Sequence, residues 1–143
     1  MAAFDPALLG GRAALVSGGG TGIGRGIALA LAAVGCDVAV VSRRAEHLEP
    51  TTAQIRERGV RSFAAVADVR HPVEVEAAVR QAHDAFGRMD ILVNAAAGNF
   101  VCPSERLSAN AWRSVLGIVL DGTFYCSRDF GRAMIAQKRG QIL

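Results

Sequence analysis

The feature that most constrains this chain is a glycine-rich turn between an apolar run of strand length and a helical pattern. The run covers residues 13–17, the turn covers 18–24, and an alanine-rich apolar pattern continues to about Gly35. A parallel strand that meets a helix through such a turn brings unpaired backbone amides and the positive end of the helix dipole to one point. Phosphates bind at such points. The order of these segments therefore predicts a dinucleotide site.

Three of the five glycines in the turn have an expected task. Gly18 is expected to take the tight turn, Gly22 to let the backbone approach a pyrophosphate, and Gly24 to let the helix pack closely on the strand. The spacing G-x-x-x-G-x-G differs from the usual G-x-G-x-x-G fingerprint of dinucleotide-binding proteins. A flexible turn is therefore the alternative, and the interpretation rests on the strand before the turn and the strand–helix units after it.

Further strand–helix units follow along the chain. We expect strands at 37–42, 62–67 and 90–94, and helices at 47–58 and 72–86, with Pro50 in the first turn of its helix. After a loop at 95–107, a long apolar pattern from Trp112 to Met134 predicts a helix that Gly117 and Gly122 weaken locally. A stop signal at 138–140 precedes a segment at 141–143 that resembles the start of a fifth strand. The predicted fold is α/β, a Rossmann-type doubly wound parallel sheet in one domain over 1–143.

Composition excludes several classes of protein. The 143 residues are 51% hydrophobic and 20% charged, which is typical of a globular domain. The net charge of +3 comes from scattered arginines without a basic run, so we expect an anionic small molecule and no nucleic acid. No apolar stretch has membrane-spanning length, and the first ten residues show no signal-peptide pattern. Three cysteines, distant from one another and from the histidines, predict free thiols, no metal site and a cytoplasmic location.

The carboxyl ends of the expected strands carry the candidate site residues, because ligand loops of parallel sheets gather there. Arg43 and Arg44 follow the second strand about twenty residues after the turn, where an NAD-binding protein usually places Asp or Glu. An acidic residue would repel a 2′-phosphate, whereas a guanidinium pairs with it. The position favours NADPH as the cofactor, and two solvated arginines are the alternative.

Two further strand ends offer polar or small residues. The carboxylate of Asp68 could accept a hydrogen bond from an adenine amino group, could cap the helix after Pro72, or could do both. Asn94 is followed by Ala95 and Ala96, whose small side chains leave room for a ribose or nicotinamide ring. An ordinary flexible turn is the alternative for this segment.

These motifs together resemble the short-chain dehydrogenase/reductase superfamily. The resemblance is carried by Ser17-Gly18-x-x-x-Gly22-x-Gly24, Asp68-Val69 and Asn94-Ala95-Ala96-x-Gly98. Within the superfamily, the stretch 94–112 is similar to the 2,4-dienoyl-CoA reductases, mainly through Gly98-Asn99-Phe100 and the residues after it. Val119 stands where the superfamily usually has an asparagine, and that branch also lacks the asparagine. The resemblance implies a cofactor set of Gly18, Gly20, Thr21, Gly22, Ile23, Gly24, Arg43, Arg44, Asp68, Val69, Asn94, Ala95 and Ala96.

The resemblance also implies an activity, the NADPH-dependent reduction of a dienoyl-CoA to an enoyl-CoA in fatty acid β-oxidation. The amide of Asn99 would donate a hydrogen bond to the thioester carbonyl as negative charge develops on its oxygen. Arg70, Phe100 and Ser108 are expected near the acyl-CoA. From the sequence alone, Asn99 beside a glycine is more simply explained as a left-handed turn residue.

One departure from the superfamily is severe. Its catalytic tyrosine and lysine follow the fifth strand, and this chain stops as that strand begins. Tyr125 and Lys138, the single tyrosine and the single lysine, are 13 positions apart and do not form the Tyr-x-x-x-Lys pair. We therefore expect the cofactor-binding front half of a reductase, inactive by itself, with the strand at 90–94 left as an uncovered edge.

Other functions remain open at this point. A related ketoacyl or enoyl reductase is the main enzymatic alternative, and a non-catalytic nucleotide-binding or subunit-pairing module is the alternative of another class. In the superfamily, the helix that corresponds to the predicted Trp112–Met134 helix pairs with its copy in a second subunit. We therefore expect the full-length parent to be a homo-oligomer, a dimer or tetramer. The expected apolar stripe on this helix is Trp112, Val115, Val119, Cys126 and Phe130.

Overall fold

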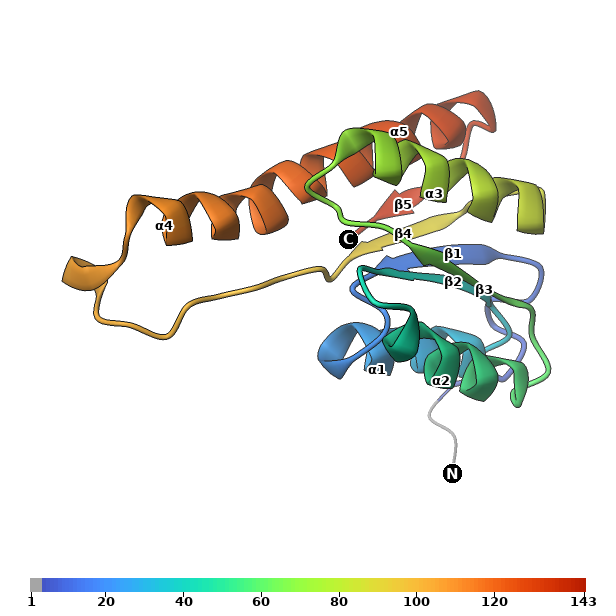
Figure 1. Ribbon diagram of the computed structural model, residues 1–143. Coiled ribbons are helices and arrows are strands. Elements are labelled where there is room, and N and C mark those ends of the chain that lie inside the picture. Colours follow the sequence, from blue (N-terminus) through green and yellow to red (C-terminus); the bar gives the residue numbers. More distant parts are fainter. Residues whose placement is uncertain (1–3) are drawn as a thin grey trace.

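A parallel sheet of five strands forms the centre of the molecule, in the order β3-β2-β1-β4-β5 (Figure 1). The computed structural model describes residues 4–143. Residues 1–3, the first of the ten residues that show no signal-peptide pattern, lie outside the described residues. The strands are β1 (Ala13–Ser17), β2 (Asp37–Ser42), β3 (Ser62–Val66), β4 (Ile91–Asn94) and β5 (Gln141–Ile142). The predicted α/β, Rossmann-type fold is confirmed.

Helices cover both faces of the sheet, because alternate residues of β1 point to opposite sides. Ala14 and Val16 pack under α1 (Gly22–Ala33) and α2 (Ala45–Arg56), together with Leu48 and Ile55. Ala13 and Leu15 belong to the other core, under α3 (Pro72–Phe86) and α5 (Gly122–Ala136). This doubly covered sheet fixes the carboxyl ends of the strands, where the chain makes its loops.

Helix α2 differs from the expectation at its start. It begins at Ala45, and Pro50 lies inside it instead of in its first turn. The Ser42 hydroxyl accepts a hydrogen bond from the Arg44 backbone N–H at 3.3 Å, which turns the chain directly after β2 and starts the helix early. The proline has no N–H, so the helix gives up the bond that this amide would donate to the carbonyl of Glu46.

The expected long helix is divided in two by a π-helical turn. Residues Ser104–Arg106 form a 3₁₀ turn, α4 covers Ala109–Leu116, and the π-turn Gly117–Asp121 leads into α5. An extra residue per turn rotates the side chains before the π-turn relative to those after it. The expected stripe is therefore wrong as a single face. Cys126 and Phe130 are buried in the core, whereas Trp112 and Val119 are 55% and 45% exposed.

The edge of β4 is covered, which corrects the expectation that it would be open. Ile91 is paired with Gln141 and Leu92 with Ile142 in β5. The Leu143 backbone extends the pairing, because its N–H donates to the Leu92 carbonyl and its carbonyl accepts from the Asn94 N–H, both at 2.9 Å. Within the described part of the chain, no helix is long and apolar enough to cross a membrane.

Candidate dinucleotide-binding site

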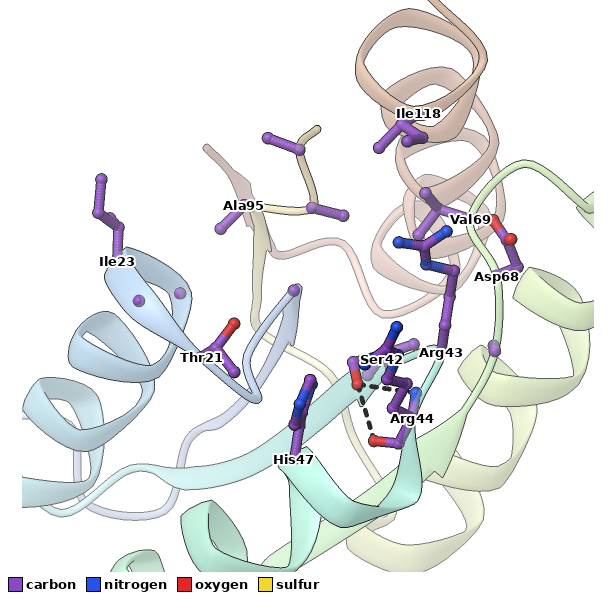
Figure 2. Close-up of a pocket in the computed structure, with 17 residues that line it drawn as sticks. Thr21, Ile23, Ser42, Arg43, Arg44, His47, Asp68, Val69, Ala95 and Ile118 are labelled. Atoms are coloured by element: carbon purple, nitrogen blue, oxygen red, sulfur yellow. Dashed lines mark hydrogen bonds between the residues drawn. The ribbon is translucent and has the colours of Figure 1, made fainter. Parts of the chain in front are cut away.

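A pocket of about 420 Å³ lies where β1 to β4 end, which is the edge of the sheet predicted to bind a ligand. It is bounded by the glycine turn, the loop after β2, the first turn of α2, the loop after β3, the loop after β4 and the π-turn (Figure 2). The residues that line it are Gly18, Thr21, Gly22, Ile23, Gly24, Val41, Ser42, Arg43, Arg44, His47, Ala67, Asp68, Val69, Ala95, Ala96, Ala97 and Ile118.

The glycine turn has the geometry of a cradle for an anion. Gly18 has φ +68°, and a Cβ there would lie 2.7 Å from the Ala95 carbonyl oxygen, so no side chain fits. A Cβ on Gly24 would overlap the Gly18 carbonyl oxygen, so its absence lets α1 pack against the turn. Gly22, at φ +53°, has open space around it. The Thr21 side chain makes no capping bond, which leaves the first-turn amides of α1 for a ligand. These residues fit a pyrophosphate.

Positive charge lines the pocket next to β2. Arg43 and Arg44 are both exposed, and the stretch from Ser42 to Ala45 contains no acidic residue. The Ser42 hydroxyl lies 3.1 Å from the Arg44 carbonyl and holds this turn in place. The guanidinium of Arg43 extends from β2 toward the loop that carries Asp68 (Figure 2).

Asp68 is paired with an arginine of its own loop. The Arg70 Nε lies 3.0 Å from both carboxylate oxygens, and its Nη2 lies 2.5 Å from Oδ2. These bonds, with a smaller contribution from the charge of Arg43, hold the pKa of the Asp68 carboxyl below its ordinary value. Asp68 does not cap α3, because the N-cap of that helix is His71. Asp68 lines the pocket, and its contact with adenine stays a prediction.

Six predicted site residues lie away from the pocket wall. Arg70, expected at the acyl-CoA, is held by Asp68. Gly20 is buried against His47, and the Asn94 amide donates to the Ser127 hydroxyl at 3.3 Å and to the Leu143 carbonyl at 3.2 Å. The other residues outside the wall come from the loop after β4 and the start of α4. These are Asn99, Phe100 and Ser108.

The loop that carries the expected substrate residues is open to solvent. Phe100 is 56% exposed, and the Ser108 hydroxyl caps α4 by accepting a hydrogen bond from the Ala111 N–H at 3.1 Å. Lys138 is the single non-glycine residue with positive φ in the described part of the chain. Asn99 is therefore not a left-handed turn residue, and the simpler explanation of this asparagine is wrong.

Six residues of the pocket wall are missing from the predicted set. Ser42 ends the strand predicted at 37–42, and Ala97 is the unspecified position of the motif Asn94-Ala95-Ala96-x-Gly98. Val41 and Ala67 lie at or next to the ends of predicted strands. His47 and Ile118 come from helices, and no sequence signal points to them. Tertiary packing brings them to the pocket, as shown by the 3.0 Å between the Ile118 Cδ1 and a Cβ built on Gly98.

The fold and the site together define a nucleotide-binding protein of the Rossmann type. The defining features are parallel strands in the order β3-β2-β1-β4, a glycine turn between β1 and α1, and a pocket at the carboxyl ends of the strands. The profile of the short chain dehydrogenase family matches residues 12–143. The chain belongs to this family of oxidoreductases, which confirms the resemblance found in the sequence.

The most informative relatives are dienoyl-CoA reductases. The chain is 39% identical over 132 residues to a probable 2,4-dienoyl-CoA reductase of Bacillus subtilis, covering 92% of this chain and 52% of that protein. It is 44% identical over 154 aligned positions to a peroxisomal 2,4-dienoyl-CoA reductase of Rattus norvegicus, covering 98% and 53%. The crystal structure of an NAD⁺-bound xylitol dehydrogenase superposes with a TM-score of 0.89 at 34% identity, covering 94% and 52%. The chain thus spans about half the length of the proteins it matches.

Proposed function

We propose that these residues form the cofactor-binding part of an NADPH-dependent reductase that acts on 2,4-dienoyl-CoA thioesters. The substrate class is supported by the similarity to the two dienoyl-CoA reductases and by the Gly98-Asn99-Phe100 segment. The cofactor preference is supported by Arg43, which lines the pocket at the end of β2 where no acidic side chain opposes a 2′-phosphate. That arginine is the observation that carries the choice of NADPH over NADH.

Different residues of the pocket would bind different parts of the cofactor. The turn from Gly18 to Gly24 and the start of α1 would hold the pyrophosphate, and Arg43 would pair with the 2′-phosphate. Asp68 and Val69 would contact the adenine, and Ala95 and Ala96 leave space beside the backbone for a sugar or ring. When bound, NADPH supplies the hydride for the reduction.

Asn99 would act on the substrate. Its amide is available because the loop after β4 is exposed, and a donor at the thioester carbonyl stabilises the negative charge that builds on that oxygen. Phe100, from the same loop, offers an apolar surface to the acyl chain. Arg70 uses Nε and Nη2 for Asp68, so Nη1 is the nitrogen that it keeps for an acyl-CoA.

The pocket wall contains no tyrosine and no lysine that could supply the proton of the reaction. Tyr125 is packed against the core under α3 and α5, with its ring 5.6 Å from that of Phe124. Lys138 follows the carboxyl end of α5, and neither residue lines the pocket. A binding module without catalysis is therefore the second candidate function for these residues.

We also propose that the parent enzyme is a homo-oligomer that pairs through α4 and the start of α5. Four large apolar side chains are exposed there, at Trp112, Val119, Leu120 and Phe124. In Figure 1, α4 projects beyond the sheet, with no other helix beside it. Pairing with a second copy would remove this apolar surface from water.

The proposed cofactor preference can be tested by fluorescence titration of the purified chain with NADPH and NADH. We expect NADPH to bind more tightly, and the Arg43→Ala variant to lose tenfold or more in NADPH affinity, because a charge-assisted bond to phosphate contributes roughly 1.5–3 kcal/mol. NADH affinity should be unchanged. The matched control is Arg58→Ala, an exposed arginine just after α2 whose Nη1 bonds the Gln54 carbonyl. Equal dissociation constants for the two cofactors in the wild type would contradict the proposal.

A further inference from the structure

Helix α2 is attached to the glycine turn through a buried hydroxyl. Thr51 is fully buried, and its Oγ1 lies 3.3 Å from the Gly20 carbonyl oxygen and 3.3 Å from the His47 carbonyl oxygen. A threonine hydroxyl has one proton, so it donates to one of these oxygens at a time or is shared between them. The bond to the Gly20 carbonyl is the one that joins α2 to the glycine turn, because the His47 carbonyl belongs to α2 itself.

Gly20 completes this contact by having no side chain. A Cβ built on Gly20 would lie 2.9 Å from the His47 Cβ and 3.1 Å from the His47 carbonyl oxygen. Any side chain at this position would push His47 away from the turn. Gly20 is outside the pocket wall, so its effect on a ligand passes through His47.

The contact places the His47 ring in the pocket wall. His47 is half-buried and lines the pocket with Thr21, Arg43 and Arg44. Figure 2 shows its ring between the turn that carries Thr21 and the Ser42–Arg44 segment. The ring makes no hydrogen bond to any residue of the described chain, so its nitrogens remain for a ligand. The one carboxylate in the wall, Asp68, is already paired with Arg70.

We propose that His47 is a specificity-determining residue for the phosphate on the adenosine ribose, and that Thr51 and Gly20 are its positioning residues. A ring N–H of His47 donates to a phosphate oxygen on the side opposite Arg43. NADH has no phosphate at this position, so the contact separates the two cofactors. The inference rests on the proposed preference for NADPH and adds a residue that sequence reasoning did not identify.

The test uses the full chain and four ligands: NADPH, NADH, and the fragments 2′,5′-ADP and 5′-AMP. We expect His47→Ala to weaken NADPH and 2′,5′-ADP roughly tenfold, as loss of one hydrogen bond to a charged group predicts, and to leave NADH and 5′-AMP unchanged. His47→Gln, which keeps a side-chain N–H donor, should restore part of the loss. His83→Ala is the matched control, because His83 lies in a separate groove between α3 and α5.

The positioning residues give a second measurement. Thr51→Val keeps the shape but removes the hydroxyl, and Gly20→Ala displaces His47. Both variants should lower the ratio of NADPH to NADH affinity while NADH still binds. A wild-type preference for NADPH that His47→Ala leaves unchanged would overturn this inference alone. Equal binding of 2′,5′-ADP and 5′-AMP by the wild type would overturn the proposed cofactor preference, and this inference with it.

Discussion

At the scale of single residues, two carboxylates mark the opposite ends of the strands. Asp68 lies at the pocket and Asp90 at the far end, and each is paired with an arginine two positions away. The Asp90 side chain is fully buried. Its oxygens accept hydrogen bonds from Arg88 Nε at 2.7 Å, Arg88 Nη2 at 2.5 Å and the Ala13 N–H at 2.9 Å. The pair thereby ties the start of β1 to the start of β4.

The charge of Asp90 should make stability depend on pH. Burial alone would raise the pKa of this carboxyl, but the bonds from Arg88 and Ala13 outweigh it and lower the pKa. The ionised Asp90 carboxylate therefore contributes to the free energy of unfolding at pH values above the ordinary aspartate pKa of about 3.9. This contribution is lost as the pH falls below about 3.9 toward the lower pKa that Asp90 has in the folded state. We expect Asp90→Asn to cost roughly 1–3 kcal/mol at pH 7 and clearly less at pH 3.

Urea unfolding at the two pH values measures this difference. Asp84→Asn is the control, because Asp84 is an exposed aspartate on α3. A cost for Asp90→Asn that is equal at both pH values would show that the carboxylate charge contributes nothing to the fold.

At the scale of elements, the π-turn is fitted to the loop after β3. A Cβ on Gly122 would lie 2.6 Å from the Val69 Cγ2, so α5 begins in direct contact with a residue of the pocket wall. At the other end of the π-turn, Gly117 faces the Arg70 side chain, whose Cδ would lie 3.6 Å from an added Cβ. The two glycines weaken the helix locally, as expected. They also let it approach the Val69–Arg70 segment and bring Ile118 to the pocket.

This packing predicts opposite effects for two substitutions in the same helix. Gly122→Ala should destabilise the chain by roughly 1–3 kcal/mol, because the added methyl group overpacks against Val69. Gly131→Ala is the matched control. Nothing lies within 4 Å of its added Cβ, so its gain in helix propensity should stabilise the chain by about 0.5–1 kcal/mol.

Thermal or urea unfolding gives both values. In a Val69→Ala background, the cost of Gly122→Ala should shrink, because the nearest methyl group is gone. If Gly122→Ala stabilises the chain as much as Gly131→Ala does, the close contact does not limit the approach of α5.

At the scale of the whole molecule, the exposed apolar surface of α4 and α5 predicts self-association. We expect the chain to associate as its concentration rises, and Phe124→Lys to reduce this association by placing a charge on the surface. Ile135→Lys, at a residue that is 78% exposed near the end of α5, is the control. Light scattering from a clean monomer at high concentration would contradict the proposed pairing through α4.

The residues of the pocket also predict that the purified chain lacks reductase activity. We expect no useful reduction of hexadienoyl-CoA, because Asn99 would serve the carbonyl oxygen but the pocket wall contains no tyrosine or lysine to supply the proton, and His47 is assigned to the adenosine end of the cofactor. General acid catalysis contributes about 10²- to 10⁴-fold, so turnover should fall far below the typical enzyme value of about 10 s⁻¹. The assay is the loss of reduced-nicotinamide absorbance with this substrate. Turnover near the typical value would mean that the proton donor lies among these residues.

Local patterns in the sequence were sufficient for most of the fold. Strand-length apolar runs, helical spacing and the glycine turn predicted all five strands and the pocket edge, because hydrophobic period and backbone freedom are properties of neighbouring residues. The same is true of Arg43, whose position at the end of β2 follows from counting along the chain. Where local signals competed, as at Pro50, the predicted boundary was wrong. The cytoplasmic location and the roles of the site residues stay predictions.

Other features depend on contacts between distant segments, which no local pattern contains. The π-turn rotates Trp112 out of the face that buries Cys126 and Phe130, and Gly122, directly after the π-turn, packs against Val69. The pairing of β4 with β5 was likewise decided by tertiary structure. His47 enters the pocket because Thr51 and Gly20 hold α2 against the glycine turn. In each case the deciding energy is steric fit or a hydrogen bond between segments that only folding brings together.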